Sequence, residues 1–546
     1  MTRQDLVREL RARPPAEAAQ VLREVQKPTV PPASAAAAPP PPGAAVPPPP
    51  AAEDPTAPAA AAQVLPEVQQ PTVSLTVPPA SAAAAPPPPA AAAAPPPPAA
   101  AVQPPPAAPP PPAAAVPPPP PAAVRPPAVT VPPPQAPVPP TASWRTLRTP
   151  NLEISVHWPG GRVPASLIVD DPMPGLNPMI DHEPGYPHRR SIPNDVLRRF
   201  ADLSERHGIQ GKFSVLPWPL ALGRLDRPET LPPESRAALP EFTELVRERI
   251  MPRYDITCEF LTHARAIDLA TGEPTAETER QWASHATAEE FADTIALAGR
   301  ILGDAGLPMD GVTSPWDSGK DNEAAYAHGV ALAMRRRGRA LAWYFLHCED
   351  KTLDVLPRIT YRGNAGLTVS IVVGAGTDPG WKTQTGGPVL VDPLIDADGR
   401  GRLTDLVAGG RPVVVCTHWQ SLYGNGSLGG LHAIDLLADR LRQRHGDRLD
   451  WVPLGRHAEM AAACATLEAR EEKPPHGGGN WRLRLTTPFP TALADITLRG
   501  LTAEGREWLA RPLAFSRTPL RTRPAADEAV CLRMPLCDGL LEATVP

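Results

Sequence analysis

Cysteine is scarce in this chain, which has six cysteines among 546 residues and no Cys-x-x-Cys motif. So few cysteines in so long a chain exclude a disulfide scaffold, and the missing motif excludes the usual zinc ribbons and thiol redox sites. Cys258, Cys348 and Cys416 lie in or near apolar, strand-like runs, which predicts buried thiols. Cys531 and Cys537 can either form a disulfide or be two free thiols.

An excess of positive charge is also missing, because the formal net charge is −5 at pH 7. This balance gives no reason to expect nucleic acid or an anionic membrane as a partner. No apolar N-terminal segment of the secretory type is visible, and proline interrupts the apolar windows of the alanine-rich part. We therefore expect no membrane span. The sequence does not identify the cellular compartment, and the cytoplasm is the default expectation.

Proline is abundant instead, and 47 of the 81 prolines fall in residues 1–140. Residues 31–142 are almost entirely Pro, Ala and Val, which cannot bury a core and therefore predict a disordered, semi-rigid linker. Residues 1–30 carry a short amphipathic pattern, and residues 18–30 return as 61–73 with two changes. The repeat indicates duplication within low-complexity sequence, with a docking peptide for a protein partner as the alternative.

From residue 143 the pattern becomes globular, and two kinds of apolar segment alternate. Short β-rich runs such as 166–169 and 412–417 predict strands, and helical periodicity over 193–207 and 287–303 predicts helices. This alternation predicts an α/β fold with a parallel sheet, most simply a distorted β/α barrel. The predicted domains are the amphipathic segment at 1–30, the linker at 31–142, the barrel at 143–470 and a small β-sandwich-like domain at 480–546.

Polar side chains stand at the ends of four predicted strands. Asp170 and Asp171 end the run 166–169, His263 follows 254–260, the segment Ser314-Pro315-Trp316-Asp317 follows 311–313, and His418 follows 412–417. In barrels of alternating strands and helices, the C-terminal strand ends carry the chemistry. Two adjacent carboxylates can divide the work, one holding a metal and the other handling a proton. For Asp170 and Asp171, a plain turn after a strand is the simpler alternative.

In this order the four segments resemble the NodB-like polysaccharide deacetylases, which are metal-dependent carbohydrate esterases of the glycoside hydrolase/deacetylase β/α-barrel superfamily. The resemblance spans residues 160–470 and marks the chain as a divergent member. It implies that Asp170 is the general base, that Asp171 and His263 bind a metal ion, and that His418 protonates the leaving amine. The implied cofactor is a divalent metal ion, with zinc first and cobalt, manganese or nickel as alternatives.

Two of the four motifs depart from that family. The second metal-binding His, expected four residues after the first, is replaced by Ile267, and the third motif has Ser314 where the family has Arg. A catalytic divalent ion typically takes three protein ligands, so one ligand is missing. Asp268 is preferred, because it adjoins the vacant position and gives a set of two carboxylates and one imidazole. The other candidates are His182, His285 and His418.

Further polar and aromatic residues have weaker expectations. Glu259 precedes the same strand end as His263, and Asp317 is a candidate to orient a ligand. Lys212 and Ser214 lie within a predicted strand as candidate inward-facing groups. The tryptophans near the strand ends are expected to pack in the core or at the rim, with stacking on a pyranose as the alternative; they are Trp316, Trp343 and Trp419.

The predicted function is a metal-dependent hydrolase that removes N-acetyl or similar acyl groups from a carbohydrate or a related acylated small molecule. Such an enzyme acts on C–N bonds other than peptide bonds. One alternative is a glycoside hydrolase-like barrel that uses Asp170 or Asp171 with a second acid such as Asp317. The other is a non-catalytic carbohydrate-binding or scaffold protein, which the loss of the second His supports.

Overall fold

The computed structural model describes residues 143–181, 188–473, 481–516, 518–524 and 529–543. The predictions for residues 1–142, including the repeat, and for His182 lie outside these residues. The largest sheet has nine strands, in the order β10-β11-β9-β8-β5-β4-β3-β12 with β13 paired to β3. The strands are β3 (Val163–Asp170), β4 (Gly211–Val215), β5 (Tyr254–Glu259), β8 (Gly311–Thr313), β9 (Leu341–Cys348), β10 (Arg358–Gly363), β11 (Gly366–Val373), β12 (Val413–His418) and β13 (Leu449–Trp451).

The sheet is parallel and curled. Every neighbouring pair from β11 through β12 is parallel, and only the edge strand β10 runs antiparallel to its neighbour. One parallel bridge between Ala375 and Val415 links the segment after β11 to β12. The prediction of an α/β fold with a parallel sheet is therefore confirmed, and the sheet is curled.

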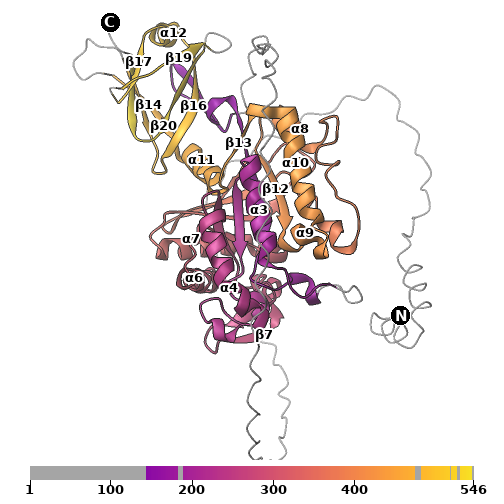
Figure 1. The fold of residues 1–546 in the computed structure, drawn as a ribbon. Coiled ribbons are helices and arrows are strands. Elements are labelled where there is room, and N and C mark those ends of the chain that lie inside the picture. The colour runs from indigo at the N-terminus through magenta and orange to yellow at the C-terminus, as the bar shows by residue number, and fades with distance from the viewer. Residues whose placement is uncertain (1–142, 182–187, 474–480, 517, 525–528, 544–546) are drawn as a thin grey trace, which may run out of the picture. The chain divides into compact units, whose positions relative to one another are not determined.

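Helices that follow the strands cover the outside of this sheet (Figure 1). The sequence sets several of their ends: α3 stops at Gly208, which has a left-handed φ of 69°, and α6 starts with a capping box between Thr287 and Glu290. The longer helices are α3 (Asn194–His207), α4 (Pro233–Leu245), α6 (Ala288–Asp304), α7 (Glu323–Arg336), α10 (Gly429–His445) and α11 (Gly455–Thr466).

The strand that carries the acid pair lies at the centre of this arrangement. All eight residues of β3 are buried, because the strand has neighbours on both edges and helices outside it. The main core beside it is rich in aromatic rings: Phe260 stacks on Tyr326 with ring centroids 5.7 Å apart, and Phe291 meets the same tyrosine at 5.3 Å. A densely packed core of this kind holds the strand ends in fixed positions.

Two five-stranded sheets lie outside the curled sheet. One has the order β1-β2-β16-β20-β19 and the other β14-β15-β21-β17-β18. Strands β1 (Arg145–Arg148) and β2 (Leu152–His157) precede β3 in the chain, yet β2 pairs with β16 (Thr491–Gly500). Strands from before and after the curled sheet in the chain therefore share one sheet, while the predicted domain limits stay predictions. The remaining strands are β14 (Glu468–Glu472), β15 (Arg482–Thr486), β17 (Leu513–Phe515), β18 (Thr518–Pro519), β19 (Thr522–Pro524), β20 (Val530–Leu536) and β21 (Gly539–Ala543).

The cysteines only partly follow the expectations. Cys258 and Cys416 are buried as predicted, but Cys348 is exposed because it ends β9 at the mouth of a cavity. Cys531 and Cys537 are free thiols, so they do not form a pair. Among the described residues, no helix has the length and apolar character needed to cross a bilayer.

Candidate metal and catalytic site

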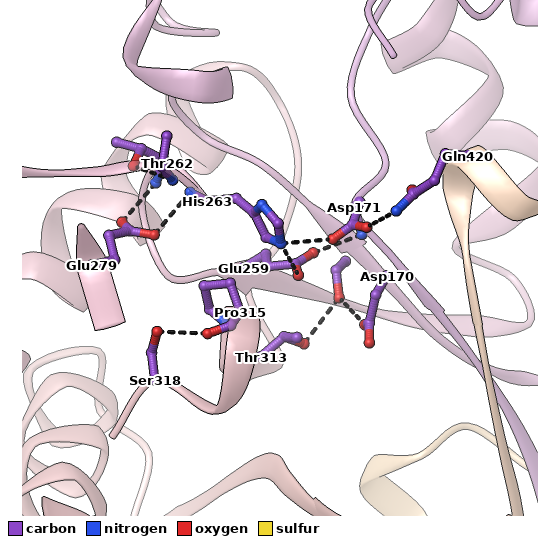
Figure 2. Close-up of polar contacts among 12 residues, drawn as sticks. Asp170, Asp171, Glu259, Thr262, His263, Glu279, Thr313, Pro315, Ser318 and Gln420 are labelled. Carbon is purple, nitrogen blue, oxygen red and sulfur yellow. Dashed lines mark hydrogen bonds and ion pairs between the residues drawn. The ribbon is translucent and has the colours of Figure 1, made fainter. Parts of the chain in front are cut away.

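Four strand ends meet at one cavity of about 560 Å³. Asp170 ends β3 and lies beside His418 of β12 in the parallel register, and Glu259 ends β5. Figure 2 shows the side chains of Asp171, Glu259 and His263 converging on one point. The polar side chains that are expected at the C-terminal strand ends therefore line one common cavity. The charged and nucleophilic residues in the wall are Asp170, Asp171, Glu259, His263, Arg280, Asp317, Cys348, Cys416 and His418.

Unusual backbone conformations surround this cavity. Asp171, His263 and Trp316 have φ values of 66°, 55° and 50°, in the left-handed region that residues other than glycine rarely adopt. Phe260 and Asp317 share this conformation, with φ values of 47° and 60°. Each such residue costs roughly 1–2 kcal/mol, which the surrounding packing must offset. These turns redirect the chain at the strand ends, and all of these side chains except that of Phe260 line the cavity.

Asp171, Glu259 and His263 form a group in which one ligand atom from each residue lies within 4.8 Å of the others. The Nε2 atom of His263 is 3.2 Å from Oδ1 of Asp171 and 3.8 Å from Oε1 of Glu259. All three side chains are buried. Gln420 donates from Nε2 to Oδ2 of Asp171 at 2.6 Å, which leaves Oδ1 facing the imidazole (Figure 2).

The charges of this group fit a divalent cation. Burial raises the pKa of Glu259 well above its usual range, and the nearby Asp171 and Asp170 carboxylates raise it further. Burial also acts to raise the pKa of Asp171, but the His263 and His418 imidazoles outweigh it and lower the pKa to about 2. Two buried carboxyl groups thus face a single imidazole, and a bound dication would stabilise the charged form of both. Two oxygens and one nitrogen suit zinc, and also the manganese, cobalt and nickel ions that accept mixed ligands.

The loop that carries His263 is held by Glu279, the first residue of α5 (Glu279–Ala283). The Oε1 atom of this buried carboxylate accepts the backbone N–H groups of Leu261 and Thr262 at 3.0 and 2.8 Å. Its Oε2 atom accepts the N–H of His263 at 2.8 Å (Figure 2). Burial raises the pKa of Glu279 to about 7, although these hydrogen bonds oppose the shift. Nothing in the sequence singles out Glu279, because its partners are backbone groups of a distant loop.

Asp170 has different partners from its neighbour Asp171. Its Oδ1 atom forms an ion pair with the Lys212 ammonium and accepts a hydrogen bond from Ser214 Oγ at 3.0 Å. The Cys416 thiol donates to its Oδ2 atom at 3.4 Å. The expectation that Lys212 and Ser214 face the site agrees with these contacts. Within the acid pair, Asp170 is thus matched with a fixed cation, and Asp171 belongs to the carboxylate–imidazole group.

His418 is oriented and charged by Asp378. The His418 Nδ1 atom lies 2.8 Å from Oδ2 of Asp378, and the same oxygen accepts the backbone N–H of His418 at 3.1 Å. Burial acts to lower the pKa of His418, but the hydrogen bond to Asp378 and the carboxylates of Asp171 and Asp170 raise it to about 9. The imidazole is therefore protonated at neutral pH, and 29% of its side-chain surface is exposed. Asp378 lies in a loop after β11 that carries no motif, so sequence reasoning missed it.

Two exposed tryptophans stand at the cavity. The ring of Trp316 is centred 4.3 Å from the ring of His263, and that of Trp381 lies 5.0 Å from His418. They are 37% and 40% exposed. Trp343 and Trp419 are buried instead, so they pack in the core as expected.

The structure does not bring Asp268 to this group. Asp268 is exposed at the end of β6 (Arg265–Asp268), a strand that forms a separate hairpin with β7 (Glu273–Thr278). The chain turns away at His263, so a residue five positions later cannot return to the same point. Glu259 occupies the position of the third candidate ligand, which the sequence predicts for Asp268. We correct the candidate ligand set accordingly to Asp171, Glu259 and His263.

The other candidate ligands also lie elsewhere. His285 pairs with Glu277 at 3.2 Å, and both side chains are well exposed. Asp317 pairs with Lys320 at 3.3 Å on the rim and does not orient a described ligand. His418 belongs to a second group, with Asp170 and Cys416.

These residues define a mixed α/β protein with an acid–imidazole site at the strand ends of a curled parallel sheet. No protein-family model matches the chain, and no curated protein matches it. Several solved structures are similar to it at low identity. One is described as a polysaccharide deacetylase from Mycobacterium smegmatis, with 13% identity over 58% of this chain and 97% of that chain, at a TM-score of 0.34.

A structure described as a polysaccharide deacetylase from Pseudomonas aeruginosa PAO1 has 12% identity over 55% of this chain and 92% of that chain, at a TM-score of 0.31. One described as a glycoside hydrolase/deacetylase from Parabacteroides distasonis has 11% identity over 62% of this chain and 81% of that chain, at 0.35. Similarities this weak assign no residue and no activity, so we argue the function from this chain's own side chains.

Proposed function

We propose that this protein is a metal-dependent hydrolase that removes an N-acetyl or similar acyl group from a carbohydrate or a related amide. One observation carries the proposal: the adjacent Asp170 and Asp171 have different partners. Asp170 is paired with buried Lys212, whereas Asp171 faces Glu259 and His263. A metal hydrolase needs this separation of a base from a ligand. The resemblance of the four strand-end segments to the NodB-like deacetylases supports the same roles.

Asp171, Glu259 and His263 would hold the divalent ion. When bound, the ion would lower the pKa of a water molecule and polarise the acyl oxygen of the substrate. The residues themselves fix its position, because Gln420 holds one oxygen of Asp171 and Glu279 holds the loop of His263. Zinc is our first choice of metal, with cobalt, manganese or nickel as alternatives.

Asp170 and His418 would handle the protons. Asp170 accepts a proton from the attacking water, because its carboxylate reaches the cavity wall and is matched by Lys212. His418 donates a proton to the leaving amine, because its pKa of about 9 keeps it protonated at neutral pH. The two residues lie side by side in the register of β3 and β12, so both can reach one scissile bond.

The rim of the cavity suits a sugar ring. Trp316 and Trp381 present exposed faces beside the His263 and His418 imidazoles. An aromatic face can stack on the apolar face of a pyranose while the polar edges of the sugar stay hydrated. This arrangement supports a carbohydrate rather than a purely aliphatic amide as the substrate.

Metal content and acetate release test the proposal together. The full chain is loaded with Zn²⁺, and the release of acetate from N-acetylated chito-oligosaccharides is measured with bound metal counted by mass spectrometry. We expect about one metal ion per chain, and acetate release that a chelator abolishes and zinc restores. A chain that binds no divalent ion, or acetate release that is unchanged after chelation, overturns the proposal. Chelator-resistant cleavage of glycosidic bonds would instead support the glycoside hydrolase alternative.

A further inference from the structure

We propose that Lys212 is the positioning residue of Asp170: it binds one carboxylate oxygen and thereby presents the other to the cavity. This inference rests on the proposed function, in which Asp170 is the base. Lys212 lies on β4 and has no exposed surface. Burying a lysine ammonium costs free energy unless the charge is paired and every N–H is hydrogen-bonded. The contacts of Lys212 must therefore offset that cost.

The ammonium group has a complete set of partners. An ammonium carries three N–H donors. Lys212 Nζ donates to Asp170 Oδ1 on β3, to Thr313 Oγ1 on β8, and to Ser214 Oγ on its own strand at 2.5 Å. The three acceptors thus come from three different strands. Their number matches the number of protons, which leaves the ammonium one orientation.

The acceptors are themselves fixed by a hydroxyl network. Ser214 Oγ and Thr313 Oγ1 are 2.9 Å apart, and Thr257 Oγ1 lies 3.1 and 3.0 Å from them. All three hydroxyl-bearing residues are buried. The ring of Phe345 lies 5.5 Å from the ammonium and adds a cation–π contact. Because all three hydroxyl groups are hydrogen-bonded, the network is rigid. It holds the Lys212 ammonium in a fixed position relative to strands β4, β5 and β8.

The consequence for Asp170 is a difference between its two oxygens. Oδ1 is occupied by Lys212 and Ser214. In the part of the chain that the structure describes, Oδ2 meets only the Cys416 thiol at 3.4 Å, and a thiol is a weak donor. Asp170 and Cys416 both line the cavity, so Oδ2 is the oxygen left to accept a proton. Lys212 also balances the negative charge of Asp170 through this ion pair.

The test compares two variants with two controls. Lys212→Met removes both charge and hydrogen bonds, and Lys212→Gln removes the charge but keeps a donor. Ser214→Ala removes a neutral donor to the same oxygen, and Lys351→Met changes an exposed lysine outside the site. Each zinc-loaded protein is assayed for acetate release from N-acetylated chito-oligosaccharides, and its bound zinc is counted.

We expect kcat to fall about 100-fold in both Lys212 variants, at the lower end of what a general base contributes. KM and the zinc content should stay within twofold, because neither the cavity rim nor the ligands change. Ser214→Ala should lose no more than about tenfold, and Lys351→Met should match the parent. A kcat near the parent value in Lys212→Met overturns the inference. So does a loss of zinc in proportion to kcat, since it would show a general collapse of the site.

A stability measurement separates this inference from the proposed function. Asp170→Asn is combined with Lys212→Met, and the urea midpoints of the parent, the two single variants and the double variant are compared. We expect the double variant to be more stable than Lys212→Met, because it no longer buries an unpaired carboxylate. If the parent releases no acetate, the function fails while this coupling remains measurable. If the parent is active but the two changes are merely additive, the inference fails and the function stands.

Discussion

The Nε2 atom of His263 lies 3.2 Å from the Oδ1 atom of Asp171, although the two residues follow different strands. Both have left-handed backbones, and both are anchored from outside, Asp171 by Gln420 and His263 by Glu279. The surrounding structure therefore holds these two atoms close together. This preorganisation is what a metal site needs if it is to bind without rearranging the loop.

The corrected ligand set predicts which substitutions remove the metal. His263→Ala and Asp171→Asn should reduce bound zinc from about one ion per chain to near zero, and acetate release should fall with it. Asp268→Asn is the matched control and should leave both unchanged, because Asp268 is exposed on a separate hairpin. Zinc counted by mass spectrometry decides between them. A loss of zinc in Asp268→Asn would instead support Asp268 as the third metal ligand.

Glu259 should have opposite effects on the metal-free and the loaded protein. Burial and two nearby carboxylates disfavour its charge, so Glu259→Gln should raise the Tm of the chelated protein by a few degrees. The same change should abolish the rise in Tm that zinc gives the parent. That rise corresponds to roughly 2.7 kcal/mol at 100 times the Kd. Thermal unfolding with and without zinc measures both effects, and a variant that zinc still stabilises would contradict them.

The acid role of His418 predicts the alkaline side of the pH profile. The pKa of His418 is raised from 6.5 to about 9, so kcat should fall as the pH rises through about 9. The same shift gives a contribution to stability that is fully present below pH 6.5 and is lost as the pH rises through about 9. Asp378→Asn removes the main partner and should move the fall in kcat to lower pH. Profiles that coincide for the parent and Asp378→Asn would exclude this role.

Glu279 should contribute to stability through the loop it holds. Glu279→Ala leaves three backbone N–H groups without their acceptor, and each buried unpaired donor costs about 1–3 kcal/mol. We expect the free energy of unfolding to fall by about 3 kcal/mol, with weaker zinc binding because His263 loses its support. Glu279→Gln keeps one acceptor oxygen and should lose less. Urea unfolding of the metal-free variants measures the difference, and equal losses would argue against the three-bond contact.

The exposed rings should act on binding more than on chemistry. Trp381→Ala should raise KM for N-acetylated chito-oligosaccharides by up to about tenfold, with kcat little changed, because stacking is worth about 0.5–1.5 kcal/mol. Leu501→Ala removes another exposed apolar side chain, outside the cavity wall, and should have no effect. Steady-state kinetics separate the two parameters. A fall in kcat alone would place Trp381 with His418 in the chemistry instead of with the sugar.

Much of the curled sheet could be predicted from the sequence, because a parallel strand covered on both sides must be a short apolar run. The run 166–169 lies within β3, and 412–417 within one residue of β12, for this reason. The ends of those runs and of the run 254–260 predict Asp170, Asp171, His263 and His418 as site residues. Glu259 also stands at a strand end, but the sequence favours Asp268 because it adjoins the position of the missing His.

The rest of the site depends on turns that periodicity does not encode. Adjacency to position 267 does not place Asp268 at the site, because a left-handed residue at His263 turns the chain into a hairpin. Glu279 and Asp378 act on backbone groups and on an imidazole from distant loops, so only the folded chain brings them to their partners. Residues that hold a site are harder to predict than residues that form it.

The single bridge between Ala375 and Val415 gives the sheet a seam. Asp378 lies just past Ala375 on one side of it, and His418 lies just past Val415 on the other. Opening the seam would therefore part the imidazole from the carboxylate that keeps it charged. Because the contact with Asp378 raises the pKa of His418, a substrate that changed their separation would change the acidity of the group meant to act on it.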